Sequence, residues 1–386
     1  MNNKRYTNRI LLFSFLMCIC FYTPVFASFF QASNRLSVNQ ITKLFACGSL
    51  AIFLFEVPTG LLGDTIGEKK SLILGSGLTA ISTLIFIYGD TPLLYVGEII
   101  FGIGSTFFSG PFDALLYKYC KTVGGKDHYT KTVSRCYSVQ WLALCVSFLG
   151  SSVFSYFGNL FVPFYATLFA NILTLGAGFY LPDTQTDNAK QPIRILKSAL
   201  ENIFHNRNLR SACLLSASFT MLLVSGYQIL QPYLSSSGMD ASYNGLIYCI
   251  AALFASCGSY CFDRIQKFSI SKNRILISCI LIIAGCYLGL ARVSGFLLIF
   301  VFVCCYRLVW GITAPMFSHM VNTSIVTDEF RDTVFSIISL FSNLLGSVFL
   351  FALGFLNMPA SVNYIVLSSL ALLISLGLTF FNRVQS

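Results

Sequence analysis

The feature that most constrains this chain is a succession of long apolar runs separated by short polar segments. A run of about 20 apolar residues crosses about 30 Å of hydrocarbon as an α-helix. Because lipid offers no hydrogen bonds to a bare backbone, such runs predict membrane-spanning helices. The expected spans are residues 10–31, 41–62, 71–88, 93–117, 134–157, 160–181, 211–234, 243–262, 275–291, 296–319, 333–356 and 362–381.

The composition of the chain points to the same fold class. Charged residues make up 10% of the sequence and hydrophobic residues 55%, whereas about 25% of the residues of ordinary soluble domains are charged. The sequence therefore excludes a soluble globular protein. It predicts an all-α integral membrane protein with twelve transmembrane helices.

The distribution of basic residues predicts the orientation of the spans. Lys and Arg are enriched in cytoplasmic loops, and a cytoplasmic amino terminus places nearly all 25 of them on the inside. We therefore expect a multi-pass protein of the bacterial cytoplasmic (inner) membrane with both termini in the cytoplasm. The net charge of +10 then reflects topology and contact with anionic lipid head groups, and no nucleic-acid partner is expected. The exceptions are Arg35, Lys43, Arg292 and Arg307.

Two local patterns have competing interpretations. Lys4, Arg5 and Arg9 before an apolar run, with Val25-Phe26-Ala27 at its end, are similar to a cleavable signal peptide. The run is longer than a usual signal core, however, and the set of twelve spans needs it. The 14 cysteines contain no C-x-x-C pair and have no matching histidine cluster, so neither a metal nor another cofactor is expected.

A long polar segment divides the spans into two groups of six. It opens with P-D-T-Q-T-D-N-A-K-Q-P at Pro182, and after Pro192 apolar residues recur at helical spacing. This spacing predicts an amphipathic helix on the inner membrane surface. The expected domains are residues 1–181, the linker 182–210 and residues 211–386. The apolar positions of the helix are Ile193, Leu196, Leu200 and Ile203.

The two groups of spans are similar in sequence. Residues 98–109, E-I-I-F-G-I-G-S-T-F-F-S, align without a gap with residues 307–318, R-L-V-W-G-I-T-A-P-M-F-S. The alignment places Glu98 opposite Arg307 in equivalent spans. After the eighth span, Asp263 lies where Asp64 lies after the second. Internal similarity of this kind is typical of transporters built from structural repeats.

The charged turn between the second and third runs carries the most specific motif. Gly60, Asp64, Gly67 and the adjacent Lys69 and Lys70 follow the spacing G-x-x-x-D-x-x-G-x-[KR]-[KR]. We expect Gly60 to permit close helix approach, Asp64 to place a carboxylate at the membrane surface, and Gly67 to form the turn. The two lysines hold the hairpin in the cytoplasm. On this motif the chain is identified as a member of the major facilitator superfamily.

The resemblance implies two six-helix repeats that enclose a central pathway, and a secondary transporter rather than an enzyme. Within the superfamily, the chain is similar to members with E-x-P-T-G in the second span, here Glu56–Gly60, and S-G-x-x-[DE]-A in the fourth, here Ser109–Ala114. Many drug exporters carry an arginine where Glu98 lies and a G-P-x-x-G-G run that residues 140–157 lack. Glu68 also replaces the usual basic residue of the turn.

Ionisable residues inside the spans are candidate transport residues, because a charge at the centre of a bilayer is costly unless it is paired or hydrated. Glu56, two residues before the helix-breaking Pro58, and Glu98 are candidate proton sites. Each acid also has a structural interpretation, Glu56 as a partner of freed backbone groups and Glu98 as an acid at the outer interface. Arg307 either pairs with Glu98 across the pathway or binds an anionic group by itself.

The resemblance also implies a gate and a polar lining. Asp113, toward the inner end of the fourth span, is expected to act as a strut of the inner gate together with the hairpin motif. Lys69 and Lys70 are the basic residues within its expected reach. The polar residues expected around the pathway are Gln31, Asn34, Gln140, Asn171, Gln228 and Gln231.

We therefore expect a secondary active transporter that moves a small organic or amphipathic solute by alternating access, coupled to protons through Glu56 or Glu98. Drug or metabolite export and nutrient or siderophore uptake both agree with the sequence. The expected partners are the solute, protons and membrane lipids, and the expected state is a monomer. A transporter-like sensor and a polytopic membrane enzyme are the rivals. No Walker motif is present, and no nucleophile or metal constellation includes His128, His205 or His319.

Overall fold

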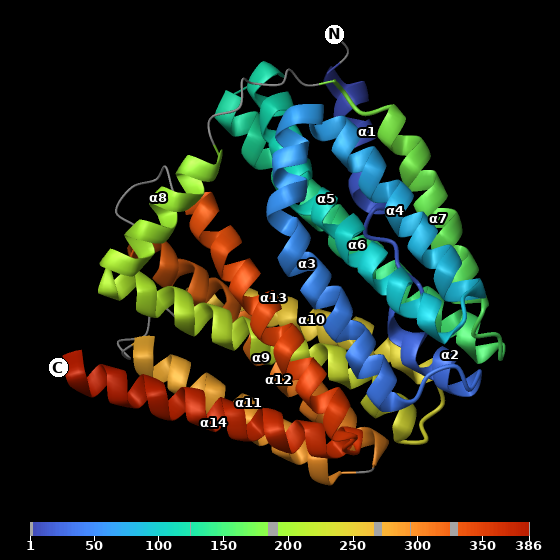
Figure 1. Cartoon of the computed structure of the whole chain (residues 1–386), viewed down its shortest axis with the longest axis vertical. Helices are drawn as coiled ribbons and strands as arrows, with labels where there is room; N and C mark the ends of the chain where they lie inside the picture. Colours follow the sequence, from blue (N-terminus) through green and yellow to red (C-terminus); the bar gives the residue numbers. More distant parts are fainter. Residues whose placement is uncertain are drawn as a thin grey trace. The chain divides into compact units, whose positions relative to one another are not determined.

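The computed structural model describes residues 3–123, 125–183, 192–265, 272–293, 295–324 and 331–385, and this part of the chain is built of helices (Figure 1). The elements are α1 (Asn3–Leu16), η1 (Thr23–Val25), α2 (Phe26–Ala32), α3 (Val38–Ile66), α4 (Glu68–Tyr88), α5 (Thr91–Val123), α6 (Gly125–Tyr156), α7 (Val162–Phe179), α8 (Pro192–His205), α9 (Arg207–Ser236), α10 (Ser242–Ile265), α11 (Lys272–Arg292), α12 (Phe296–Ser324), α13 (Arg331–Leu356) and α14 (Ala360–Gln385).

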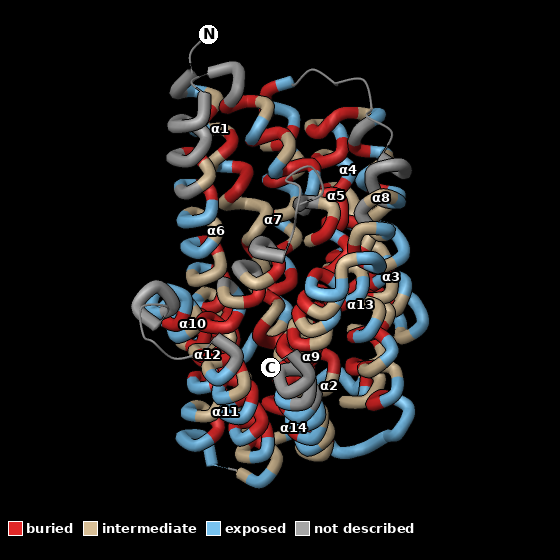
Figure 2. Tube along the Cα trace, turned by 90° about the vertical axis from the view of Figure 1, so that its left-hand side faces the viewer, coloured by how far each residue is buried: buried red, intermediate tan, exposed pale blue. Residues whose placement is uncertain are grey.

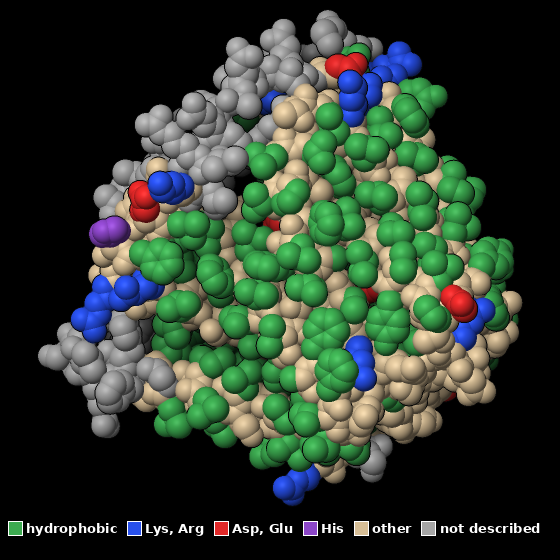
Figure 3. Space-filling view, viewed as in Figure 1, with side chains coloured by type: hydrophobic (Ala, Val, Ile, Leu, Met, Phe, Trp, Pro, Cys, Tyr) green, Lys and Arg blue, Asp and Glu red, His purple; other side chains and the backbone are tan. Residues whose placement is uncertain are grey.

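Within the described residues, ten helices are long and apolar enough to cross a membrane. They are α3 to α7 and α9 to α13, and they correspond to the second to eleventh expected spans. The twelfth expected span is α14, whose apolar stretch Ala360–Leu376 is shorter. Hydrophobic side chains cover most of the face in Figure 3, and charged side chains are sparse there. Such a surface suits a lipid environment rather than water.

The first expected span, 10–31, is not a continuous helix, so the prediction of one unbroken helix there is wrong. α1 ends at Leu16, and a new helix, α2, begins only at Phe26 after the short 3-10 turn η1. The intervening backbone is bonded to side chains of other helices. Cys20 N donates to Ser147 Oγ at 3.0 Å, and Phe21 N donates to Thr167 Oγ1 at 2.9 Å. These hydroxyl groups replace the helical hydrogen bonds, so the interruption leaves those amides satisfied inside an apolar protein.

The chain forms two compact units. The first unit comprises residues 1–36 and 44–192, and the second comprises residues 37–43 and 193–386. In the first unit α4 packs against α5 and α7, while α1 packs against α6 and α7. In the second unit α10 packs against α12, α11 against α14, and α9 against α13. Buried and exposed stretches alternate along most helices in Figure 2, as expected for helices with one face on a core.

The linker helix α8 packs on the second unit. Ile203 is buried in a cluster with Leu209, Ala212 and Val334, and Leu200 packs against the same cluster. The predicted apolar face is thus used for docking on α9 and α13, at least over its second half. The side chains of Ile193 and Leu196, and residues 184–191 of the linker, lie outside the described residues.

Phenylalanine rings dominate one core region of the first unit, the phenylalanine cluster. It consists of Phe26, Phe29, Phe30, Phe86 and Phe164 together with Tyr22. The centroids of Phe29 and Phe164 are 4.3 Å apart, and those of Phe26 and Phe30 are 4.8 Å apart. Rings at such distances contribute stacking energy in addition to burial. The cluster joins α2 to α4 and α7.

Tyrosine rings take the corresponding role in the second unit, in the tyrosine cluster of Tyr233, Tyr287, Tyr306 and Tyr364. Three of these rings, Tyr287, Tyr306 and Tyr364, are completely buried. Tyr233 OH donates to the carbonyl of Leu290 at 2.7 Å, and Tyr364 OH donates to that of Gly226 at 3.2 Å. This cluster therefore joins α9, α11 and α14 by hydrogen bonds as well as by packing, whereas Tyr306 of α12 joins it by packing alone.

Glycines at positions aligned by the internal repeat lie at close helix crossings. A Cβ added at Gly102 of α5 would lie 2.8 Å from the carbonyl oxygen of Gly48 in α3. The aligned residue in the second unit, Gly311 of α12, lies against the backbone of Ala255 in α10, with no room for a Cβ. Both crossings depend on a residue without a side chain, because the backbones approach too closely for any other.

Candidate transport site

The hairpin between α3 and α4 turns at Gly67, whose φ of 91° lies in the left-handed region that favours glycine. Its amide donates to the carbonyl of Gly63 at 2.9 Å. The close approach expected at Gly60 is not found, since a Cβ there would meet no atom within 4 Å. Gly63 is the tighter position, because a Cβ added there would lie 3.4 Å from the side chain of Pro111 in α5. The side chain of Asp64 lies outside the described residues.

Glu68, the departure from the usual motif, pairs with a lysine of α5. Lys118 Nζ lies 2.6 Å from Glu68 Oε1, and the glutamate side chain is only 7% exposed. The chain therefore places the acid on the hairpin and the base on α5. This pair was missed by sequence reasoning, because the two residues are 50 positions apart and no local spacing connects them.

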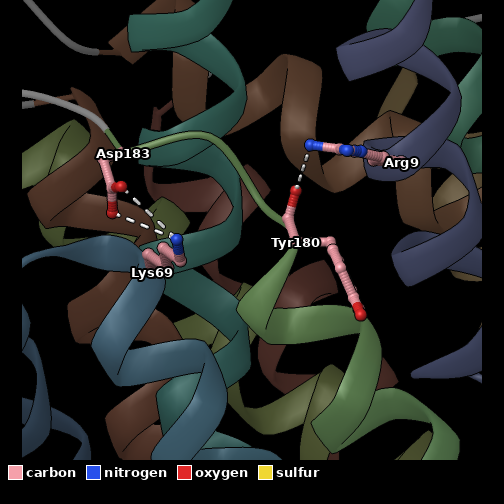
Figure 4. Close-up of polar contacts among 4 residues, drawn as sticks. All are labelled: Arg9, Lys69, Tyr180 and Asp183. Atoms are coloured by element: carbon pink, nitrogen blue, oxygen red, sulfur yellow. Dashed lines mark hydrogen bonds and ion pairs between the residues drawn. The ribbon is translucent and has the colours of Figure 1, made fainter.

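The lysine next to Glu68 holds the end of α7. Lys69 Nζ lies 3.2 Å from Asp183 Oδ1, and Figure 4 shows the two side chains directed toward each other. Arg9 of α1 donates to the carbonyl of Tyr180 at 3.3 Å (Figure 4). Three helices of the first unit thus meet at this edge. Asp113 is exposed on α5, and Lys70 is exposed at the start of α4.

The predicted proton site Glu56 lies on an unbroken α3. The helix continues through Pro58, although proline cannot donate the usual backbone hydrogen bond. The hydroxyl of Thr59 donates to the carbonyl of Phe55 at 2.7 Å and also contacts Thr106 of α5 at 3.0 Å. Threonine thus supports the helix next to the proline, and the Glu56 side chain is half-buried.

The other acid, Glu98, is enclosed within the first unit. Its residue is 8% exposed, and a Cβ added at Gly48 of α3 would lie 2.5 Å from Glu98 Oε1. The absence of a side chain at Gly48 therefore makes the space that holds the carboxyl group. The predicted interpretation as an interfacial acid does not fit this burial.

The candidate cation, Arg307, lies over the rings of two aromatic side chains of the second unit. Its guanidinium carbon is 4.4 Å from the ring centroid of Trp310 and 4.9 Å from that of Tyr227. Its Nε atom is buried and makes no hydrogen bond. Cation–π contacts at these distances hold the guanidinium group in place. The predicted pairing of Arg307 with Glu98, which belongs to the other unit, stays a prediction.

Several predicted lining residues have hydrogen-bonding roles inside one unit. Gln140 Nε2 of α6 donates to Ser14 Oγ of α1 at 3.1 Å, and Asn171 Nδ2 of α7 donates to Thr83 Oγ1 of α4 at 3.0 Å. Both bonds join neighbouring helices.

The remaining predicted lining residues lie at helix ends or within a helix. Asn34 is exposed, has a φ of 53° and follows α2, and its amide donates to the carbonyl of Gln31 at 3.0 Å. Gln31 thus lies in the last turn of α2, and Asn34 lies in the turn that follows it. In α9, Gln228 is half-buried, and Gln231 is buried with no partner for its Oε1.

The second unit contains a cavity of about 420 Å³ between α9, α12 and α13. A volume of this size fits a small organic molecule. The wall combines aromatic rings with hydroxyl and amide groups, and none of the described residues that line it is charged. The lining residues are Ser216, Phe219, Thr220, Leu223, Val224, Trp310, Ala314, Phe317, Phe335, Ile338, Ser339, Ser342 and Asn343.

Sequence reasoning missed this lining, although a signal was present. Ser216 and Thr220 are four residues apart on α9, and Ser339 and Asn343 are four residues apart on α13. Polar residues that recur at helical spacing in an apolar span mark one face of that span. The prediction instead took other amides, of which Gln140 and Asn171 serve contacts between helices of the first unit.

The sequence matches the family model of the Major Facilitator Superfamily over residues 10–350. The chain therefore belongs to this superfamily of transporters. The predicted fold class, an all-α membrane protein with the superfamily fold, is confirmed, and so is the expectation of a transporter rather than an enzyme. The protein is accordingly a multi-pass membrane protein.

Relatives and solved structures agree with this assignment. An uncharacterized MFS-type transporter of Methanocaldococcus jannaschii is 23% identical over 284 residues, which are 72% of each chain. The lactose permease of Citrobacter freundii is 29% identical over 134 residues, 33% of this chain and 32% of the permease.

Two solved structures share the fold over nearly the whole chain. The nucleoside transporter NupG has a TM-score of 0.77 at 13% identity and covers 98% of both chains. A D-xylose-proton symporter has a TM-score of 0.73 at 15% identity and covers 96% of both chains. At these identities the likeness concerns the fold.

Proposed function

We propose that this protein is a secondary active transporter that moves a small organic solute by alternating access between its two six-helix halves, coupled to protons through Glu98. The observation that carries this proposal is the enclosed carboxyl group of Glu98 beside Gly48. A carboxyl group inside an apolar helix crossing is a proton acceptor whose charge depends on access to water. Glu56, which is half-buried on α3, is the alternative proton acceptor.

The cytoplasmic hairpin is proposed as the inner gate. The motif residues Gly60, Asp64, Gly67, Lys69 and Lys70, with Asp113, lie at or near the ends of α3, α4 and α5. The ion pairs of Glu68 with Lys118 and of Lys69 with Asp183 attach this turn to α5 and to the end of α7. Cytoplasmic termini and an inner-membrane location belong to the same proposal, and the basic loops support this orientation. A monomeric state is also part of the proposal.

Proton-driven flux in proteoliposomes tests the coupling. Glu98→Gln should abolish accumulation of a bound solute under an imposed pH gradient, while exchange of labelled for unlabelled solute continues, because only the proton step is removed. Reversing the gradient distinguishes uptake from export.

The control for this experiment is Glu201→Gln on the exposed face of α8, which should accumulate solute like the unmodified protein. Normal proton-driven accumulation in Glu98→Gln would remove Glu98 from the coupling. Loss in Glu56→Gln with a normal Glu98→Gln would transfer the proton site to Glu56.

A further inference from the structure

We propose that the cavity of the second unit, together with Arg307, binds a small organic anion: a carboxylate that carries an aromatic or heteroaromatic ring. This inference rests on the proposed transport function and names its substrate class. Arg307, Trp310, Ala314 and Phe317 are spaced by three or four residues on α12, and the last three line the cavity. Residues at such spacing share one helix face, so Arg307 continues the cavity wall by one turn.

The apolar helix segments around Arg307 supply no acid as a partner for its charge. The apolar helix segments of the second unit are 207–236, 242–261, 274–292, 296–314, 333–356 and 360–376. Their sequences contain no Asp or Glu. A cation inside a membrane protein is costly without a counter-charge, and the buried Nε of Arg307 makes no hydrogen bond. An anionic solute supplies both the charge and an acceptor for the guanidinium group.

Glu98 is the competing partner, and the first unit gives its carboxyl group another place. Oε1 of Glu98 fills the space above Gly48, at the crossing of α3 and α5. The rings of Trp310 and Tyr227 contact the guanidinium group from within the second unit. We therefore assign the solute, rather than Glu98, as the counter-ion of Arg307.

The aromatic part of the wall selects the body of the solute. Phe219 and Phe317 have centroids 4.9 Å apart, and Trp310 and Phe335 complete the apolar surface of the cavity. Such rings bind a planar ring by offset or edge-to-face contacts.

The polar part of the wall disfavours a neutral sugar. The hydroxyl of Ser342 donates to the carbonyl of Ile338 at 2.7 Å, and the Asn343 amide donates to that of Ser339 at 3.0 Å. Because these two side chains donate to carbonyls of their own helix, they have less capacity to donate to the hydroxyls of a solute. A polyol would leave polar groups unpaired, which lowers its affinity.

Tryptophan fluorescence of the purified full-length protein tests the proposal. The chain has two tryptophans, Trp141 and Trp310, so Trp141→Phe on the exposed face of α6 leaves Trp310 as the reporter. The probes are matched pairs of acid and amide: benzoate with benzamide, nicotinate with nicotinamide, and cyclohexanecarboxylate with its amide. D-xylose and uridine serve as neutral comparisons.

We expect benzoate or nicotinate to bind at least tenfold more tightly than its amide, and cyclohexanecarboxylate to bind more weakly than benzoate. Arg307→Gln should remove the preference for the acid, while Arg307→Lys should retain part of it. Retention in the lysine variant shows that the loss in Arg307→Gln comes from the charge and not from misfolding. Glu98→Gln should leave the preference within about twofold.

Three results would overturn the proposal. The first is equal binding of acid and amide throughout the panel. The second is an unchanged acid preference in Arg307→Gln. The third is a tenfold rise in the affinity for benzoate or nicotinate in Glu98→Gln, which would show that Glu98 is the counter-ion of the Arg307 guanidinium group. Proton-driven flux of D-xylose or uridine without binding of the acids would contradict this inference but not the proposed transport function. Binding of the acids without any flux would contradict the transport function but not the anion site.

Discussion

The two halves of this transporter are built on similar helices, but they solve the burial of polar groups in different ways. In the first unit the aromatic core is mainly phenylalanine, and the membrane helices carry the acids Glu56, Glu68, Glu98 and Asp113. In the second unit the core is tyrosine, and the apolar helix segments carry Arg307 but no acid. The difference suggests a division of labour, with proton and gate residues in the first half and solute recognition in the second.

The aromatic cores show what this difference means physically. Phenylalanine rings such as Phe26 and Phe164 can only pack, so their own contribution to joining α2 and α7 is contact area. Tyrosine hydroxyls in the second half donate to helix carbonyls, for example Tyr233 to Leu290 and Tyr287 to Leu222. Those bonds connect α9 to α11 at defined points along the two helices.

The largest expected effect concerns the buried ion pair of the first half. Lys118→Met would remove the ion pair of the buried Glu68 carboxylate and should destabilise the protein by about 3 kcal/mol. Thermal unfolding of the detergent-purified protein measures the effect. The double variant Glu68→Gln with Lys118→Met should recover most of the loss, because both charges are then removed.

The exposed pair beside it is the matched control. Asp183 is 88% exposed, so Lys69→Ala should change stability by no more than about 0.5 kcal/mol. Equal effects of Lys118→Met and Lys69→Ala would show that the hairpin is not held by burial of Glu68. The ion pair with Lys118 would then contribute no more to stability than an exposed pair does.

The second prediction compares equivalent helix crossings. Gly311→Ala places a Cβ on the backbone of Ala255 and should destabilise by about 2 kcal/mol, whereas Gly102→Ala meets Gly48 and Ala51 with more space and should cost about 1 kcal/mol. Melting temperatures of the two variants give the comparison.

Controls for this pair are Gly285→Ala and Gly110→Ala, whose added Cβ would meet no atom within 4 Å. Both controls should melt within the range set by helix propensity alone. A greater loss in Gly102→Ala than in Gly311→Ala would reverse the order of tightness assigned to the two crossings.

The third prediction exchanges the chemistry of the two aromatic cores. Phe164→Tyr buries a hydroxyl group among phenylalanine rings and should destabilise by about 2 kcal/mol. Tyr364→Phe removes one hydrogen bond to Gly226 and should destabilise by about 1 kcal/mol. Thermal unfolding of the two variants in the same detergent gives the comparison. If Phe164→Tyr left the stability unchanged, the phenylalanine cluster would accept a buried hydroxyl group as readily as the tyrosine cluster does.

Much of the fold follows from the sequence because it depends on local patterns. Apolar length determined the positions of α3 to α7 and α9 to α14, since lipid accepts a backbone only when its own helix satisfies it. The spacing after Pro192 predicted α8, and Gly67 occurs where the chain needs a positive φ. The hairpin motif indicated the superfamily to which the chain belongs.

Tertiary structure decided whatever depends on distant residues. The interruption after α1 requires hydroxyls of Ser147 and Thr167, more than 120 positions along the chain. Glu68 acquired its partner from α5, and the cavity arose where α9, α12 and α13 meet. Hydropathy records only whether a residue belongs in a membrane helix. It does not record which side chain of another helix will lie opposite, and that pairing determines the charges, the hydrogen bonds and the candidate site.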